Sequence, residues 1–315
     1  MKILVMGAGA VGGYFGGVLS KSGEEVTLVA RGQHLEAINR DGLRVESVAS
    51  GDFTVHPPAI ERPDGTWKAD LALLCVKSYH NQRAMETMKP AVGDGTAILT
   101  LQNGIGSGDR LASIFGREKV LLGAAYIEAM RRAPGVLAEV GGPCRIVFGE
   151  EDGRETERAV RIRDTFHRAG IEAQLSSEVL KELWNKLILI CALSGMTCIT
   201  RASAAEVLDS PESLDLTWRV MREAEAVGRA KGIKLSDDIV ESTMAYFQRF
   251  KHELVSSMQR DLEAGNPIEV GVLNGSIASS GKDVGVPTPV NDFIVACLAV
   301  ADNRARSRLG SASSA

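Results

Sequence analysis

The first half of the chain alternates short apolar segments with amphipathic ones. The apolar segments are rich in Val, Ile and Leu, whereas hydrophobic residues in the segments between them recur with helical spacing. Strands are predicted at Lys2–Met6, Val26–Ala30, Leu71–Val76 and Ala97–Leu101, and helices near 10–21, 33–40, 80–89 and 107–115. This alternation favours an α/β domain with a doubly wound parallel sheet that has helices on both faces.

The pattern changes twice farther along the chain. Between 119 and 149, shorter apolar runs broken by Gly and Pro predict antiparallel strands, followed by a helix at 154–169 and an edge strand at 172–175. Beyond residue 176 we expect only helices, near 178–198, 212–231, 237–264, 268–280 and 290–302. The expected organisation is therefore a first domain at 1–175, a helical domain at 176–305 and a disordered tail at 306–315.

Composition and charge narrow the class of protein. The 315 residues are 44% hydrophobic and 24% charged, and their formal net charge of −4 argues against nucleic-acid binding. We find no stretch of ~18 apolar residues, so no membrane span is expected. None of the five cysteines forms a CxxC motif, and the five histidines lack metal-ligand spacing. We therefore expect a cytoplasmic protein without a structural metal.

A glycine motif stands where the first strand meets the first helix. Its residues, GxGxxG in pattern, are Gly7, Ala8, Gly9, Ala10, Val11 and Gly12. Glycines at these positions allow a tight turn and close approach of the backbone to a pyrophosphate, which the helix N-terminus then binds. The alternative is a glycine turn that only lets a helix pack closely. The position after a strand favours dinucleotide binding.

Three polar residues follow predicted strands, at the edge where ligands of α/β sheets bind. Arg31 stands where an NAD site would carry Asp or Glu, and a guanidinium there can bind the 2′-phosphate of NADP. Its alternative is a solvated surface arginine. Lys77 and Asn103 are candidates for cofactor contacts, but the residues alone equally fit turn chemistry, since Asn103 precedes a glycine.

The helical half holds further candidates, each with a structural alternative. Lys186 lies at the edge of an apolar helix face, where it is either a lysine that extends past the core or a partly desolvated proton donor. Asn266, Pro267 and Glu269 have the spacing of a helix cap. Ser257 fits a small packing residue within a helix.

Taken together in this order, these segments resemble the ketopantoate reductase family (2-dehydropantoate 2-reductases). The resemblance covers roughly residues 1–300, and its more specific motifs are the lysine helix at 183–187 and the Ser-Ser-Met segment with Glu269. It implies a Rossmann-type domain joined to an all-helical domain like that of 6-phosphogluconate dehydrogenase.

The resemblance also implies roles for individual residues. NADPH would lie on the glycine loop, with Arg31 at the 2′-phosphate and with Lys77 and Asn103 along the cofactor. Lys186 would be the general acid, Ser257 would bind substrate, and Glu269 would lie beside the reacting groups, next to both cofactor and catalytic lysine. Asn103 and Lys186 would also contact the substrate.

The chain departs from the family pattern at two positions on the lysine helix. The pantoate-forming enzymes carry asparagines one and two turns after the lysine, where this chain has Ile190 and Ser194. Isoleucine cannot replace an amide as a hydrogen-bonding group, which puts the identity of the substrate in question.

We expect an NADPH-dependent reductase that makes (R)-pantoate from 2-dehydropantoate in pantothenate synthesis. The alternatives are a paralogue acting on another 2-keto acid or an imine, and a non-catalytic NADP-binding sensor. The expected partners are a small-molecule 2-keto acid and, in a homodimer, a second copy of the chain, with neither nucleic acid nor membrane.

Overall fold

The computed structural model describes residues 1–312, with side chains described as far as 308. The chain divides into two compact units. The first comprises Met1–Gln102 and Ser107–Val179, and the second comprises Asn103–Gly106 and the chain from Leu180 onward. The division therefore falls four residues beyond the expected one, and the short segment after Gln102 belongs with the helical unit, which the sequence pattern did not predict.

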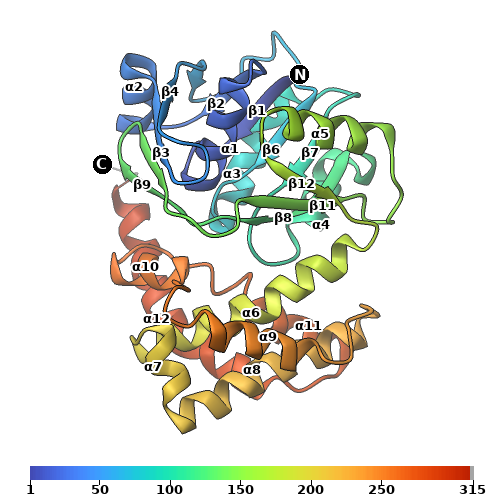
Figure 1. Cartoon of the computed structure of the whole chain (residues 1–315), viewed down its shortest axis with the longest axis vertical. Coiled ribbons are helices and arrows are strands. Elements are labelled where there is room, and N and C mark those ends of the chain that lie inside the picture. Colours follow the sequence, from blue (N-terminus) through green and yellow to red (C-terminus); the bar gives the residue numbers. More distant parts are fainter. Residues whose placement is uncertain (313–315) are drawn as a thin grey trace. The chain divides into compact units, whose positions relative to one another are not determined.

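The first unit is built on an eight-stranded sheet in the order β12-β11-β8-β7-β6-β1-β2-β5 (Figure 1). Neighbouring strands from β5 through β8 pair in parallel, whereas β11 pairs antiparallel with β8. The strands are β1 (Lys2–Met6), β2 (Glu25–Val29), β5 (Ala59–Ile60), β6 (Leu71–Leu74), β7 (Ala97–Thr100), β8 (Val120–Tyr126), β11 (Arg145–Gly149) and β12 (Glu172–Leu175). β6 and β7 are buried along their whole length, as apolar parallel strands covered on both faces should be.

A second, four-stranded sheet has the order β4-β3-β10-β9. Its strands are β3 (Leu43–Ser47), β4 (Phe53–Val55), β9 (Ala129–Ala133) and β10 (Val136–Glu139). The sequence pattern missed β3, β4 and β5, which are short and lie among charged and turn residues. The expected antiparallel region at 119–149 is also divided, because β8 extends the parallel sheet and β10 pairs in parallel with β3.

Helix α1 (Ala10–Lys21) packs between the two sheets, which explains its glycines. A Cβ atom on Gly16 would lie 2.9 Å from Leu28 of β2, and one on Gly13 would lie 2.4 Å from Leu137 of β10. The other helices of this unit are α2 (Gly32–Asp41), α3 (Asn81–Met88), α4 (Ser107–Phe115) and α5 (Glu157–Arg168), with 3₁₀ turns η1 (Ser78–His80), η2 (Lys89–Ala91) and η3 (Arg117–Lys119).

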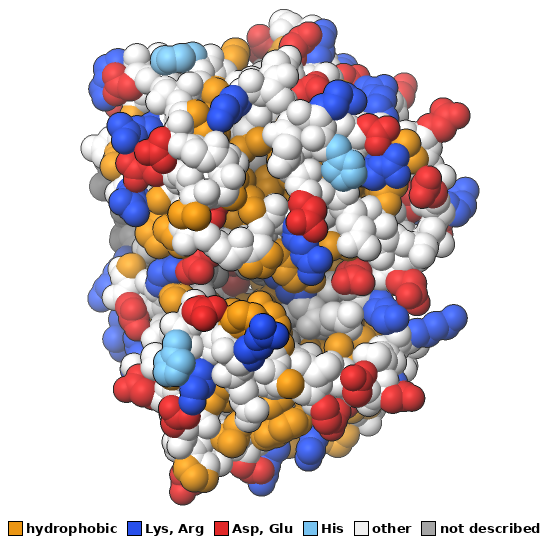
Figure 2. Space-filling view, viewed as in Figure 1, with side chains coloured by type: hydrophobic (Ala, Val, Ile, Leu, Met, Phe, Trp, Pro, Cys, Tyr) orange, Lys and Arg blue, Asp and Glu red, His pale blue; other side chains and the backbone are white. Residues whose placement is uncertain are grey.

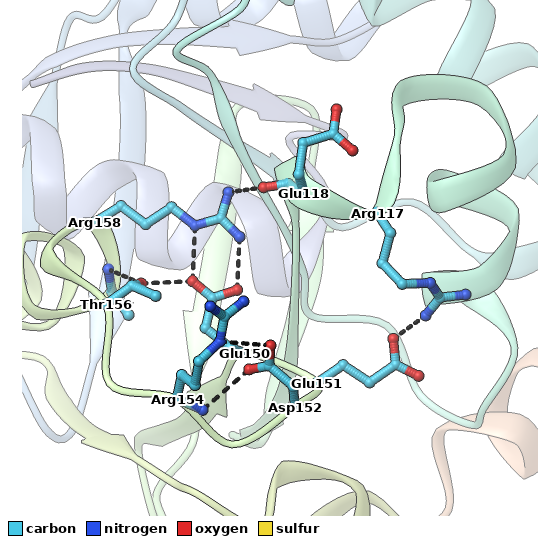
Figure 3. A network of polar contacts seen from close by, with 9 residues as sticks. Arg117, Glu118, Glu150, Glu151, Asp152, Arg154, Thr156 and Arg158 are labelled. Carbon is cyan, nitrogen blue, oxygen red and sulfur yellow. Dashed lines mark hydrogen bonds and ion pairs between the residues drawn. The ribbon is translucent and has the colours of Figure 1, made fainter.

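A carboxylate anchors the loop that joins β11 to α5 (Figure 3). Glu150, only 7% exposed, accepts hydrogen bonds from Nε and Nη2 of Arg158 at 2.8 and 2.6 Å. It also accepts one from Oγ1 of Thr156 at 2.6 Å, and Thr156 in turn caps the first turn of α5. Because Arg158 also donates to the Glu118 carbonyl, this network ties α5 to the turn before β8.

The second unit consists of helices around one apolar core, as the sequence pattern predicts. On the face drawn in Figure 2, acidic and basic side chains are interspersed. The helices are α6 (Val179–Thr200), α7 (Ala204–Asp209), α8 (Pro211–Ala230), α9 (Ile239–Arg249), α10 (Ser257–Glu263), α11 (Asn274–Val284) and α12 (Pro289–Ala312).

The single long helix expected at 237–264 is wrong. α9 ends at Arg249, and α10 begins only at Ser257. The hydroxyl of Ser256 accepts the backbone N–H of Gln259 at 3.1 Å, which starts a new helix. Apolar spacing continues across the break, so the periodicity did not reveal it.

The expected disordered tail is also wrong where the structure describes it. α12 continues through Ala312, while 313–315 lie outside the described residues. Nε of Arg306 donates to Asp302 at 2.8 Å, one turn earlier, and Ala305 is buried. The ion pair stabilises the helix around residues 302–306, and the burial of Ala305 shows that this turn packs against the unit.

One helix comes near the length and composition of a membrane span, although the sequence analysis expected no such span. α6 meets that length and composition, with a mean hydropathy of 1.5 over its best window. However, 67% of that window is buried inside the fold, which is typical of a core helix.

Candidate functional site

The glycine motif forms a loop that is open toward one side. Gly7 has φ +104°, in the left-handed region that favours glycine, and a Cβ atom on Gly12 would lie 2.2 Å from the Gly7 carbonyl oxygen. A Cβ atom on Gly9 would meet nothing within 4 Å. Gly9 caps α1 without a side-chain hydrogen bond, so backbone N–H groups of the first turn can bind an anion. The loop therefore fits a dinucleotide pyrophosphate.

A buried histidine that the sequence analysis missed holds this loop in place. His34 contacts the Ala8 carbonyl through Nε2 at 2.7 Å, and its Nδ1 accepts the backbone N–H of Gly135 at 2.9 Å. Because Nδ1 is the acceptor, the proton of the neutral ring lies on Nε2. Burial lowers the pKa of His34 and so favours the neutral form. His34 shares the buried face of α2 with Ala37 and Ile38, a spacing that could have identified it.

Arg31 and Lys77 flank the glycine loop. Strand register places Met6 opposite Val29 on one side and Leu74 on the other. Arg31 and Lys77 follow those two strands, at the same edge of the sheet. Both side chains are half-buried. The structure thus brings the two cofactor candidates to either side of the loop.

An amide network joins the ends of β6 and β7. Nε2 of Gln102 donates to the Val76 carbonyl and to Oδ1 of Asn81, both at 2.6 Å. Gln102 and Asn81 are both buried. Gln102 thus fixes the backbone immediately before Lys77, a role that the sequence analysis did not assign.

In the second unit, Asn103 and Lys186 are in direct contact. Nζ of Lys186 donates a hydrogen bond to Oδ1 of Asn103 at 2.8 Å, although the two residues are 83 positions apart. Lys186 is half-buried on α6. Burial lowers its pKa from 10.5 to about 8, and the negative charge of Glu269 partly opposes this shift. An ammonium with such a pKa can lose its proton closer to neutral pH than an ordinary lysine.

Glu269 lies in a turn that packs against the Asn103 segment. Gly104 has φ +84°, and a Cβ atom there would lie 2.2 Å from the Val272 carbonyl oxygen. The Glu269 carbonyl accepts the backbone N–H groups of Val272 and Leu273 at 3.1 and 3.2 Å. Glycine at 104 therefore lets the Asn103 turn approach the segment that carries Glu269, whose side chain is buried.

The interpretation of Asn266, Pro267 and Glu269 as a helix cap is wrong. These residues are not helical, and α11 begins only at Asn274. The N–H of Ile268 donates instead to Oδ1 of Asp302 at 2.9 Å, which draws the segment toward α12. The charge on Glu269 acts on Lys186 rather than on a helix end.

The remaining substrate candidates, Ile190, Ser194 and Ser257, differ in their burial and in what they contact. Ile190 packs against the apolar core of the second unit. Ser194 is 5% exposed, and its hydroxyl accepts a hydrogen bond from Oγ of Ser256 at 3.0 Å. Ser257 is the half-buried first residue of α10. The serine that contacts α6 is thus Ser256, which sequence reasoning did not single out.

Metal-ligating side chains do not gather at this site. Across residues 1–312, no three His, Cys, Asp or Glu side chains are grouped so that they could hold a metal ion. The candidate chemistry of the second unit is therefore that of an ammonium, an amide and a carboxylate.

Comparisons with known proteins agree with this architecture. Residues 3–153 match the model of the ketopantoate reductase PanE/ApbA family, and 178–302 match that of its C-terminal domain. The 2-dehydropantoate 2-reductase of Pyrococcus horikoshii is 30% identical over 313 residues, covering 99% of this chain and 100% of the relative.

Two solved structures show the range of related proteins. A PanE/ApbA family ketopantoate reductase from Ralstonia eutropha is 34% identical, with a TM-score of 0.89, over 97% of this chain and 100% of that chain. A D-mandelate dehydrogenase in complex with NADH is 25% identical, with a TM-score of 0.86, over 96% and 100%. With both of its units matched, the chain belongs to the ketopantoate reductase family of oxidoreductases.

Proposed function

We propose that the protein is an NADPH-dependent reductase that converts 2-dehydropantoate to (R)-pantoate in pantothenate synthesis. The observation that carries this proposal is the 2.8 Å contact between Lys186 and Asn103, together with the lowered pKa of the lysine. Neither a snorkelling lysine nor a turn asparagine requires such a contact. The names of the P. horikoshii and R. eutropha relatives support the substrate class.

Lys186 is the proton donor in this proposal. With a pKa of about 8, its ammonium is mostly protonated at neutral pH, yet it gives up its proton more readily than an ordinary lysine. Its proton would pass from Nζ to the keto oxygen, where negative charge builds during reduction. Asn103 orients the ammonium, and the Glu269 carboxylate keeps it charged.

The first unit would hold the cofactor. When bound, NADPH supplies the hydride for the keto carbon. Gly7–Gly12 and the first turn of α1 would bind the pyrophosphate, Arg31 the 2′-phosphate, and Lys77 the adjoining part of the cofactor. The open side of the loop at Gly9 supports this assignment.

A second candidate is the reduction of another 2-keto acid or of an imine. Ile190 offers no hydrogen bond to the hydroxyl of 2-dehydropantoate, and the Ser194 hydroxyl already accepts one from Ser256. The related D-mandelate dehydrogenase is named for a 2-hydroxy acid, mandelate, that differs in shape from pantoate. These observations favour a site that is less selective for the substrate hydroxyl.

A steady-state assay with NADPH and a panel of 2-keto acids tests this proposal. Turnover with 2-dehydropantoate supports the first function, and turnover only with other keto acids or imines supports the second. Stoichiometric NADPH binding without oxidation would instead indicate a sensor. The presence of both Lys186 and Glu269 favours catalysis.

Location and assembly are further parts of the proposal. All five cysteines are free thiols, which supports a reducing compartment such as the cytoplasm. A homodimer is the proposed assembly, and sedimentation at several protein concentrations would test it.

A further inference from the structure

Two arginines come to the same edge of the first sheet, on either side of the glycine loop. Arg31 follows β2, and Arg83 lies in the first turn of α3, which follows β6. β1 lies between those two strands and leads directly into the glycine loop. The fold therefore places the two guanidinium groups around one end of the dinucleotide loop.

Arg83 stands on a firmly held helix start. Asn81, the first residue of α3, is 2% exposed. Its Oδ1 accepts from Nε2 of Gln102 at 2.6 Å, and its Nδ2 donates to Oγ of Ser107 at 3.4 Å. The Arg83 side chain is exposed above this anchored turn. Its position is thus set by the network that also fixes the end of β6.

The two guanidinium groups are close enough for their like charges to interact. Burial lowers the pKa of Arg31, and the positive charge of Arg83 lowers it further, while Glu61 acts in the opposite direction. Among the side chains that the structure describes, neither arginine forms an ion pair, not even with Glu61. Two such cations repel one another. A doubly charged anion bound to both would attract each of them and so offset that repulsion.

We propose that Arg83 binds the 2′-phosphate of the adenosine ribose together with Arg31, and thereby helps to determine the preference for NADPH over NADH. This inference rests on the proposed NADPH dependence. It adds a second residue, from another element, to the single arginine that the sequence pattern identifies. A phosphate dianion matches two fork-shaped guanidinium donors better than it matches one.

The test uses two nucleotides that differ only in the phosphate concerned. Adenosine 2′,5′-bisphosphate and adenosine 5′-monophosphate are titrated by calorimetry into the full-length protein and into Arg83→Ala, Arg83→Lys and Arg31→Ala. Arg161→Ala is the matched control. Arg161 is also exposed, and it pairs at 3.3 Å with Asp70, which precedes β6 at the opposite edge of the sheet.

We expect Arg83→Ala to weaken binding of the bisphosphate by about 3- to 30-fold while changing binding of the monophosphate less than about twofold. Arg83→Lys should bind the bisphosphate with an affinity between those of Arg83→Ala and the unchanged protein, because lysine keeps the charge but lacks the fork. Arg161→Ala should match the unchanged protein. The bisphosphate dissociation constant should also rise less steeply with salt in Arg83→Ala, because one phosphate contact is lost.

Two results would overturn the inference in distinguishable ways. If Arg31→Ala weakens bisphosphate binding and Arg83→Ala does not, Arg83 has no part in the site and the proposed NADPH dependence stands. If the unchanged protein binds both nucleotides equally, the 2′-phosphate site and the NADPH dependence fail together. An assay of keto acid reduction with NADH would then show whether the protein uses that cofactor instead.

Discussion

Nζ of Lys186 lies 2.8 Å from Oδ1 of Asn103, which joins the middle of α6 to the turn that follows β7. The amide oxygen accepts a hydrogen bond from the ammonium and therefore fixes the direction of the lysine side chain. Because burial lowers the pKa of this lysine to about 8, its charge state changes within the range in which activity can be measured.

This pKa predicts a pH profile for reduction. If the Lys186 ammonium is the donor, as proposed, kcat should be constant well below pH 8 and should fall about tenfold per pH unit above it. The measurement is kcat with saturating NADPH and keto acid between pH 6 and 10. A rate that stays constant up to about pH 10 would show that Lys186 does not donate the proton.

Glu269→Gln should move that profile toward lower pH. The Glu269 carboxylate raises the pKa of Lys186 against the effect of burial, so its neutral isostere should let the pKa fall further. At pH 7.5 the variant should lose activity while its melting temperature stays nearly constant. Glu241→Gln, at an exposed site on α9, is the control. An unshifted profile in Glu269→Gln would remove Glu269 from the mechanism.

Ile190→Asn should sharpen the choice of substrate. An amide at this position can bond the hydroxyl of 2-dehydropantoate, whereas isoleucine cannot. The ratio of kcat/KM for 2-dehydropantoate to that for 2-ketoisovalerate should therefore be modest in the native protein and larger in the variant. A native ratio above about 10⁴, typical of a site built to bond a hydroxyl, would mean that another residue makes this contact.

His34 should make the fold sensitive to acid. Its pKa is lowered in the folded protein below the ordinary value near 6.5, so the unfolded chain binds more protons as pH falls. The free energy of unfolding should be largest above about pH 6.5 and decrease below it. In His34→Gln this decrease should be smaller, whereas His252→Gln, at an exposed site, should behave like the native protein. The free energy of unfolding is measured by urea titration at several pH values. The same decrease with falling pH in all three proteins would contradict this role.

The sequence predicted those features that depend on local pattern. Each buried strand, like the glycine motif, lies within one short stretch of the sequence. Its apolar or glycine residues are therefore recognisable from the residues next to them. For this reason the parallel sheet and the helical unit could be predicted and were confirmed by the fold and the family comparisons. The glycine motif also stands between β1 and α1 as expected, and its role in dinucleotide binding stays a prediction.

Features that depend on distant contacts could not be predicted in the same way. The residues around Glu269 have the spacing of a helix cap, but no helix begins there, because the N–H of Ile268 donates to Asp302, 34 residues away. Helical spacing of apolar residues continues on both sides of the break before Ser256. The contact of Ser256 with Ser194 joins residues 62 positions apart. The contact between Asn103 and Lys186 likewise could be seen only in the folded chain, since the two residues are 83 positions apart and nothing in their neighbouring sequence links them.

The role of Lys186 is tested most directly by Lys186→Ala. The account predicts that kcat for 2-keto acid reduction falls by about 10²–10⁴ while the dissociation constant for NADPH, measured by fluorescence titration, changes little. Lys181→Ala, on the same helix, serves as the control. A Lys186→Ala protein that keeps most of its turnover would contradict the assignment of this lysine as the proton donor.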